Sequence, residues 1–199
     1  VAEFWEKNYS DAFDGSFTPV EDLESYNSES PSSPEICGGE TYGNPNALFC
    51  PPDHLIAWDR GVLIPLGQQF FSDTSIAALL AHEYGHAVQA RTGLLTAGWW
   101  YRYVATSKAK ANEYARRLEL QADCLAGSTM NALARATALN AADRKGFAEV
   151  LAAIADDTLT GVISQHGSAK ARTRWLALGL GTSAIKACKT FTASADKVR

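Results

Sequence analysis

The chain has 199 residues, enough for a single domain with its own hydrophobic core. Hydrophobic residues make up 46% and charged residues 20% of it, which excludes a disordered or fibrous protein. The formal net charge of −4 argues against a general nucleic-acid-binding protein, and no apolar run reaches the roughly 18 residues that a transmembrane helix needs. These numbers predict nothing about the oligomeric state.

The N-terminal part of the chain is acidic. Residues 1–59 contain 12 acidic residues and one basic residue, whereas residues 60–199 contain 10 acidic and 17 basic residues. Residues 25–35 are rich in Ser and Pro and predict an exposed linker. We therefore expect one domain over residues 1–199, with an acidic N-terminal segment and a Ser/Pro linker within residues 1–35.

A short helix is predicted over residues 3–13, with four aromatic side chains mostly on one side. Burial of such side chains favours docking of this helix onto the rest of the domain. Two arrangements stay open: the segment is an integral part of the core, or it is a removable cover over a cleft. The alternative to both is a solvated acidic tail.

Strand and helix patterns follow in chain order. Residues 54–60 predict a strand, and residues 62–71 suit either a strand or a short helix. Alanine-rich sequence then predicts helices over residues 72–92, 107–138, 143–159 and 168–178. Gly93 is expected to end the first of these helices, and Gly127 to be a possible break in the second. Residues 94–106 contain an aromatic cluster, Trp99 to Tyr103, expected to be buried as core or cover, with a substrate-cleft wall as the alternative.

The four cysteines form an even set, which favours two disulfides and an oxidising compartment over four free thiols. Cys37 and Cys50 flank a loop rich in Gly, Pro and Asn that a bridge would tie down. The remaining pair is Cys124 and Cys188. Because residue 1 is Val rather than Met, we expect a mature chain that is extracytoplasmic or secreted, with its signal or anchor removed.

One motif carries a specific chemistry. Residues 82–86 read His82-Glu83-Tyr84-Gly85-His86, an H-E-x-x-H pattern within a predicted helix. Residues i and i+4 share one helix face, so both imidazoles can reach one zinc ion. Glu83 lies beside them and can act as general base towards a zinc-activated water.

A catalytic zinc site takes a third protein ligand, which must come from elsewhere in the chain. The candidates are His54, His166 and carboxylates on the later helices. Glu119 and Asp123 are also spaced i, i+4 on a predicted helix and are the leading candidates. In that arrangement Glu119 would bind zinc, and Asp123 would accept a hydrogen bond that orients a ligand imidazole.

The segments HEYGH and ELQADCLAG together resemble the bacterial family of putative neutral zinc metallopeptidases, often called YpfJ-like. That family is similar to gluzincins with an HExxH…ExxxD pattern. The resemblance covers roughly residues 1–180 and implies a zincin-like α+β domain, mainly helical with a small antiparallel sheet. It also implies His82, His86 and Glu119 as zinc ligands, Glu83 as base and Asp123 as the orienting residue.

A further segment runs from His166 to Arg172 and is similar to the His-Pro-x-x-x-x-Arg segment of related gluzincins, with Gly167 in place of Pro. The resemblance implies that His166 donates a hydrogen bond to the oxyanion of the transition state. Arg172 either belongs to the site or pairs with a helix carboxylate. His54 is expected to have no catalytic role.

The sequence thus predicts a zinc-dependent metalloendopeptidase acting on peptide or protein substrates. In zincins the substrate lies extended beside an edge strand, and we expect residues 54–60 to be that strand. Two alternatives remain: a non-catalytic zinc-bearing interaction protein, and a latent protease whose N-terminal segment covers the cleft.

Overall fold

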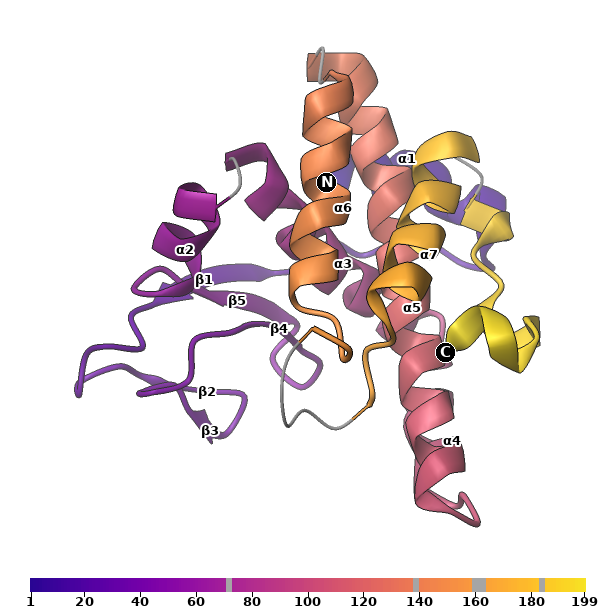
Figure 1. Ribbon diagram of the computed structural model, residues 1–199, viewed down its shortest axis with the longest axis horizontal. Helices are drawn as coiled ribbons and strands as arrows, with labels where there is room; N and C mark the ends of the chain where they lie inside the picture. The colour runs from indigo at the N-terminus through magenta and orange to yellow at the C-terminus, as the bar shows by residue number, and fades with distance from the viewer. Residues whose placement is uncertain (71–72, 138–139, 159–163, 183–184) are drawn as a thin grey trace.

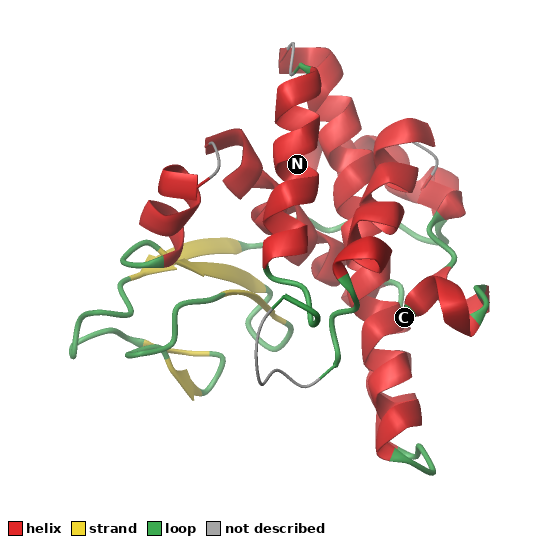
Figure 2. Cartoon of the chain, in the orientation of Figure 1, coloured by secondary structure: helices red, strands yellow, loops and turns green. Residues whose placement is uncertain are grey.

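The computed structural model describes residues 1–70, 73–137, 140–158, 164–182 and 185–199. As predicted, it is a zincin-like α+β fold that is mainly helical, with the strands at one side of the helices (Figure 1; Figure 2). In chain order the helices, strands and 3-10 helices are α1 (Ala2–Ala12), β1 (Asp22–Tyr26), β2 (Glu35–Ile36), β3 (Gly39–Glu40), β4 (Ala47–Cys50), β5 (Leu55–Asp59), α2 (Leu63–Phe70), α3 (Asp73–Arg91), α4 (Leu94–Tyr103), α5 (Lys108–Thr137), α6 (Ala141–Ala153), α7 (Ala169–Thr182), η1 (Ile185–Ala187), η2 (Thr190–Thr192) and η3 (Ala195–Val198).

The main sheet is mixed, and the prediction of an antiparallel sheet is wrong in this respect. Its strand order is β1-β5-β4, with β1 parallel and β4 antiparallel to β5. The N-terminal segment supplies β1, whose pairing with β5 runs from Asp22 opposite Leu55 to Tyr26 opposite Asp59. β2 and β3 form a separate two-stranded hairpin.

Helix α5 is continuous over the expected break at Gly127. This glycine serves close packing instead: a Cβ atom there would collide with the backbone of Leu176 in α7. A Cβ atom at Gly179 of α7 would likewise collide with the backbone of Cys124 in α5. The two glycines therefore let α5 and α7 approach with their backbones almost in contact.

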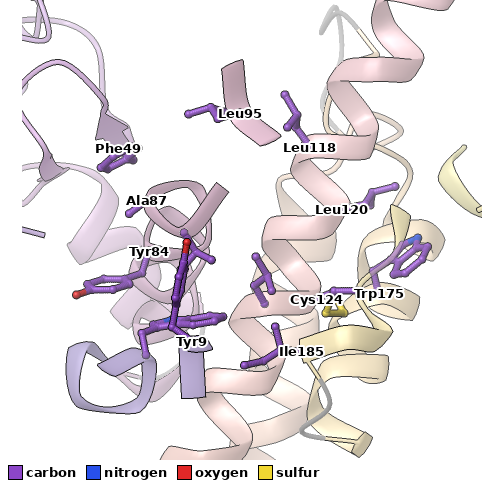
Figure 3. Close-up of a cluster of buried hydrophobic side chains, with 14 of the residues drawn as sticks. Tyr9, Phe49, Tyr84, Ala87, Leu95, Leu118, Leu120, Cys124, Trp175 and Ile185 are labelled. Carbon is purple, nitrogen blue, oxygen red and sulfur yellow. A yellow bond between two sulfur atoms is a disulfide. The ribbon is translucent and has the colours of Figure 1, made fainter. Parts of the chain in front are cut away.

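Helix α1 packs into the hydrophobic core. The side chains of Trp5 and Tyr9 are 0% and 2% exposed and belong to the same buried cluster as Tyr84 of α3. Figure 3 shows Tyr9 and Tyr84 together in this cluster. Docking of the N-terminal helix through its aromatic residues agrees with the prediction.

The expected linker over residues 25–35 is wrong in its first part. Tyr26 lies in β1 and is buried, and its hydroxyl contacts the carbonyl oxygens of Asn44 and Asn46 at 3.0 and 2.9 Å. Ser28 is also buried, and its backbone N–H donates to Asp59. The polar composition of residues 25–35 did not predict these contacts, because the partners Asn44, Asn46 and Asp59 lie 18–31 positions further along the chain.

The cysteines pair as predicted, Cys37 with Cys50 and Cys124 with Cys188. The second bridge joins α5 to the C-terminal 3-10 segment across 64 residues of chain. None of the helices in the described part of the chain is long and apolar enough to cross a membrane.

A single buried carboxylate joins the sheet to α2. Asp59, at the end of β5, accepts backbone N–H bonds from Ser28, Gly61, Val62 and Leu63 at 2.7–3.1 Å. Burial disfavours its charged form, but these four donors outweigh burial and lower the pKa of Asp59 to about 2. Charged Asp59 therefore stabilises the start of α2 and the loop after β1 together.

We predict that Asp59→Asn lowers the free energy of unfolding by about 2–4 kcal/mol at pH 7, because an amide cannot accept all four bonds. Since the folded pKa is depressed, this stabilisation is present above the ordinary pKa near 4 and is lost as pH falls towards 2. Urea unfolding of both proteins across this pH range measures the difference. Asp22→Asn, an exposed carboxylate of β1, is the control and should change stability by less than about 0.5 kcal/mol. An equal, pH-independent loss in both variants would contradict the assignment.

Candidate metal and catalytic site

The two motifs of the sequence lie on helices that cross closely. α3 carries the HEYGH residues and α5 carries Glu119 and Asp123. At the crossing, a Cβ atom on Gly85 would lie 3.0 Å from the backbone Cα and O atoms of Ala122. The glycine before the second histidine thus brings the histidine face of α3 against the acidic face of α5.

Three ligand-type atoms converge at this crossing. The Nε2 atoms of His82 and His86 are 3.1 Å apart, and Glu119 Oε2 is 3.2 Å from the first and 3.6 Å from the second. Ligands held tetrahedrally at roughly 2.0–2.1 Å from a zinc ion are about 3.3 Å from one another. The spacing of these three atoms therefore fits one zinc ion between them.

The hydrogen bonds of the His82 and His86 rings explain why the three converging atoms suit a cation. His82 Nδ1 is 2.7 Å from Oδ1 of Asp123, and His86 Nδ1 is 2.8 Å from Oε1 of Gln89. Both partners are acceptors, so each Nδ1 carries a proton, and in the neutral ring each Nε2 presents its lone pair. Two lone pairs and a carboxylate then face one point, which only a positive charge can stabilise.

The pKa shifts of the site residues also indicate a position that favours positive charge. Burial disfavours the charged form of His82, but the nearby charge of Asp123 and hydrogen bonds to Asp123 and Glu119 raise its pKa to about 10. Burial likewise opposes ionisation of Glu119, yet the neighbouring His86 and His82 hold the pKa of that carboxyl well below its usual range. A proton on an imidazole therefore supplies positive charge between these atoms, and a metal ion that bound there would displace it.

Asp123 is fixed by a second partner. Arg172 of α7 donates to both carboxylate oxygens, from Nε and Nη2, at 2.9 Å each. Both side chains are almost completely buried, and Nη1 of Arg172 also donates to the carbonyl of Ile154 at 3.3 Å. Of the two roles considered for Arg172, its contacts favour pairing with a helix carboxylate, and that carboxylate is the one beside His82.

Gln89 was not singled out by the sequence patterns. Its side chain is fully buried, and Nε2 donates to the carbonyl of Leu118 at 2.8 Å and to Gln121 Oε1 at 3.0 Å. These donations turn Oε1 towards His86. The available signal was its position three residues after His86, on the same helix face, as an amide among apolar neighbours.

Glu83 lies at the edge of a cavity of about 470 Å³ that opens onto the three converging atoms. Burial raises the pKa of Glu83, whereas His82, His86 and a backbone hydrogen bond from Phe49 oppose this rise. The cavity is lined by residues from β4 and the chain before it, from α3, α4 and α5, and by Leu63, Ile154, His166 and Arg172. It is large enough for several residues of an extended peptide.

The strand beside this cavity is β4, so the expectation that residues 54–60 form the edge strand is wrong. β5 (Leu55–Asp59) is the central strand, with β4 on its cavity side. The N–H of Asp59 donates to the carbonyl of Asn46 at 2.8 Å. Because alternate residues of an antiparallel strand face its partner, the backbone groups of Ala47 and Phe49 face away from β5.

The two remaining histidines differ in position. His166 lines the cavity with a side chain that is 46% exposed, and its Nδ1 lies 3.4 Å from Oδ1 of Asp156. The N–H of Gly167 donates to the other oxygen of that carboxylate at 2.6 Å. His54 is not among the residues of the described chain that line the cavity, and both its ring nitrogens are buried without a partner in that part of the chain.

The acidic N-terminal segment does not cover the cavity in this structure. Among the described residues, those that line the cavity begin at Pro45, and α1 packs into the core instead. The structure therefore favours the first of the two arrangements considered for this segment.

Comparisons with known proteins agree with this chemistry. The sequence profile of the family described as "Putative neutral zinc metallopeptidase" matches residues 23–191. The chain is 28% identical over 166 residues to the uncharacterized protein YpfJ of Escherichia coli K12, covering 78% of this chain and 57% of YpfJ. It is 31% identical over 168 residues to the uncharacterized protein Mb2605 of Mycobacterium bovis, covering 74% of this chain and 55% of that protein.

The chain thus spans little more than half the length of these relatives. No solved structure matches it significantly. The family profile covers most of the chain and includes both the HEYGH segment and the Glu119–Asp123 pair. The chain therefore belongs to the family of putative neutral zinc metallopeptidases.

Proposed function

We propose that the chain is a zinc-dependent metalloendopeptidase. The observation that carries the proposal is the convergence of His82 Nε2, His86 Nε2 and Glu119 Oε2 at zinc-ligand spacing, beside Glu83 and an open cavity. When bound there, zinc would polarise a substrate carbonyl and lower the pKa of a water molecule. Residues of this chain would carry out substrate binding and proton transfer.

The edge of the sheet beside the cavity would bind the substrate. An extended peptide beside β4 would pair with backbone groups of Ala47 and align its scissile bond with the cavity. Phe49 contributes its N–H to Glu83, which holds that carboxylate at the edge of the strand. The same strand would thus position both the peptide and the general base.

Glu83 is the proposed general base. Its carboxylate takes a proton from the attacking water as oxygen bonds to the carbonyl carbon, and then gives that proton to the leaving amine as the C–N bond breaks. Proton transfer of this kind contributes roughly 10²–10⁴-fold to the rate. His166 is proposed to donate a hydrogen bond to the oxyanion, with Asp156 as its positioning residue.

A non-catalytic zinc-bearing protein is the second candidate. Structural zinc sites are closed by four protein ligands, whereas catalytic sites keep one position for water or substrate. Within the described residues, the cluster has three ligand-type side chains and borders the cavity. This observation supports the catalytic reading. The two disulfides support an extracytoplasmic location for the protein.

The first prediction concerns the metal. Purified protein should contain roughly one zinc ion per chain, and His86→Ala and Glu119→Ala should each lose it, because two ligands hold zinc poorly. Elemental analysis after dialysis measures the content. His54→Ala is the control and should keep its zinc. Full zinc content in both site variants would exclude the proposed ligands.

The second prediction concerns Gln89. Gln89→Met removes the acceptor for His86 Nδ1 and should weaken zinc affinity by about 10–100-fold, as loss of such outer contacts typically does. Gln121→Met interrupts the same buried amide chain one step further from the imidazole and should weaken affinity much less. Competition with a chromogenic chelator measures both. Equal losses would mean that packing, rather than orientation of His86, is responsible.

The third prediction separates catalysis from metal binding. Glu83→Gln keeps the size of the side chain but removes the base, so zinc should remain while peptide hydrolysis falls by roughly 10²-fold or more. Cleavage of a denatured protein mixture, followed by mass spectrometry of new termini, measures the activity. A Glu83→Gln protein that cleaves at the wild-type rate would refute the assigned base. Zinc-loaded wild-type protein that cleaves nothing would favour the non-catalytic alternative.

A further inference from the structure

The end of α4 exposes a dense group of aromatic side chains, contrary to the expectation that this cluster is buried. We call Trp99, Trp100, Tyr101, Tyr103 and Val104 the aromatic tip; their exposed fractions are 48, 60, 47, 83 and 47%. Figure 1 shows α4 and the start of α5 projecting beyond the remaining helices and strands. Clustered exposure of large apolar side chains typically marks an interaction surface.

The distribution of these side chains around the helix indicates what kind of surface they contact. At about 100° per residue, the five residues of the aromatic tip cover an arc of about 200°. A helix that docks in a protein groove usually presents an apolar stripe of about 100°. An arc twice as wide suits immersion of the helix end in a medium that surrounds it.

The charges near the aromatic tip are mostly positive. Between Glu83 and Glu113 the chain contains no acidic residue but four basic ones, Arg91, Arg102, Lys108 and Lys110. Lys108 and Lys110 are exposed at the start of α5, directly after the turn that follows the aromatic tip, and Lys110 Nζ also donates to the Glu113 carboxylate at 3.0 Å. This charge is opposite to that of residues 1–59 and complements an anionic surface.

The projecting hairpin is held in shape by packing. The rings of Tyr101 and Tyr114 are stacked with centroids 5.1 Å apart, and Lys110 Nζ lies 5.0 Å from the Tyr114 centroid. Gly98 lies so close to Leu118 of α5 that a Cβ atom there would displace the leucine side chain. The aromatic tip is therefore presented by a preformed helix pair.

We propose that the aromatic tip, with Lys108 and Lys110, binds the surface of an anionic lipid bilayer. Trp and Tyr favour the membrane–water interface because their rings are apolar and their N–H and O–H groups remain hydrated. Basic residues beside them attract anionic headgroups, and their apolar stems can lie along the acyl boundary. The protein would bind peripherally, with the end of α4 immersed at headgroup depth.

This surface is continuous with the cavity, since Trp99 and Arg102 also line it. Binding through the aromatic tip would hold the cavity opening near the bilayer. If the proposed peptidase function holds, its substrates are polypeptide segments at a membrane surface. Only this consequence rests on the proposed function, because lipid binding by the aromatic tip requires no catalysis.

Vesicle binding tests the proposal directly. The zinc-loaded chain should sediment with vesicles of phosphatidylcholine mixed with phosphatidylglycerol, and much less with phosphatidylcholine alone or in high salt. Of the five tryptophans, Trp5 and Trp175 are buried and Trp58 is partly buried in β5, so a blue shift of tryptophan emission and quenching by brominated lipids that disappear in the Trp99→Phe, Trp100→Phe variant would report on the aromatic tip. Absence of binding to the anionic vesicles would overturn the proposal.

Matched variants locate the contact. Trp100→Ala combined with Tyr103→Ala should weaken binding by at least about tenfold, and Lys108→Gln with Lys110→Gln by about fivefold for each charge removed. The controls are Leu23→Ala with Tyr42→Ala, exposed apolar residues of the sheet region, and Lys145→Gln on α6, an exposed lysine paired with Glu149. Unchanged binding in both sets of tip variants would overturn the assignment.

Two further measurements separate lipid binding from catalysis and from self-association. Glu83→Gln should bind vesicles like the wild type, whether or not the protein proves to be a peptidase. Sedimentation velocity without lipid should show the same oligomeric state for the wild type and the Trp100→Ala, Tyr103→Ala variant. A wild-type dimer that this variant dissociates would overturn the proposal in favour of self-association.

Discussion

The buried contact of Asp123 with Arg172 and His82 is the interaction on which the site depends. It joins α5, α7 and α3 through one carboxylate, with three bonds of 2.7–2.9 Å. Removing one partner of such a buried pair typically costs about 3–5 kcal/mol, because the other charge remains without compensation. The contact therefore fixes the helix arrangement and, in the same geometry, the proton on His82 Nδ1 that leaves Nε2 free to bind a cation.

The second imidazole, that of His86, is supported through Gln89 and a chain of buried amides. Gln89 receives its orientation from Leu118 and Gln121, and Gln121 Nε2 donates to the carbonyl of Cys188 at 2.9 Å. Cys188 is itself joined to Cys124, the residue after Asp123. The disulfide thus anchors the C-terminal segment that completes the buried amide chain. Both histidines are oriented by contacts between segments far apart in the sequence.

Local spacing predicted the parts of the site that lie on single helices. The i, i+4 positions of His82 and His86, and of Glu119 and Asp123, place each pair on one face of a helix regardless of the remaining fold. Alanine-rich composition predicted the helices, and the cysteine count predicted the two bridges. These features depend on helix geometry or residue chemistry alone, so the sequence by itself determined them, together with a set of side chains that suits a zinc ion.

Tertiary structure decided which elements lie beside one another. β5 is the central strand because β1 and β4 flank it on both sides, and the edge strand beside the cavity is β4. Arg172 meets Asp123 only once α5 and α7 have packed, and the amide of Gln89 is oriented towards His86 by acceptors on α5. The aromatic tip is exposed because α4 extends past the helices that would cover it. Strand neighbours, buried polar partners and exposure all depend on long-range contacts, which the periodicity of a single segment does not encode.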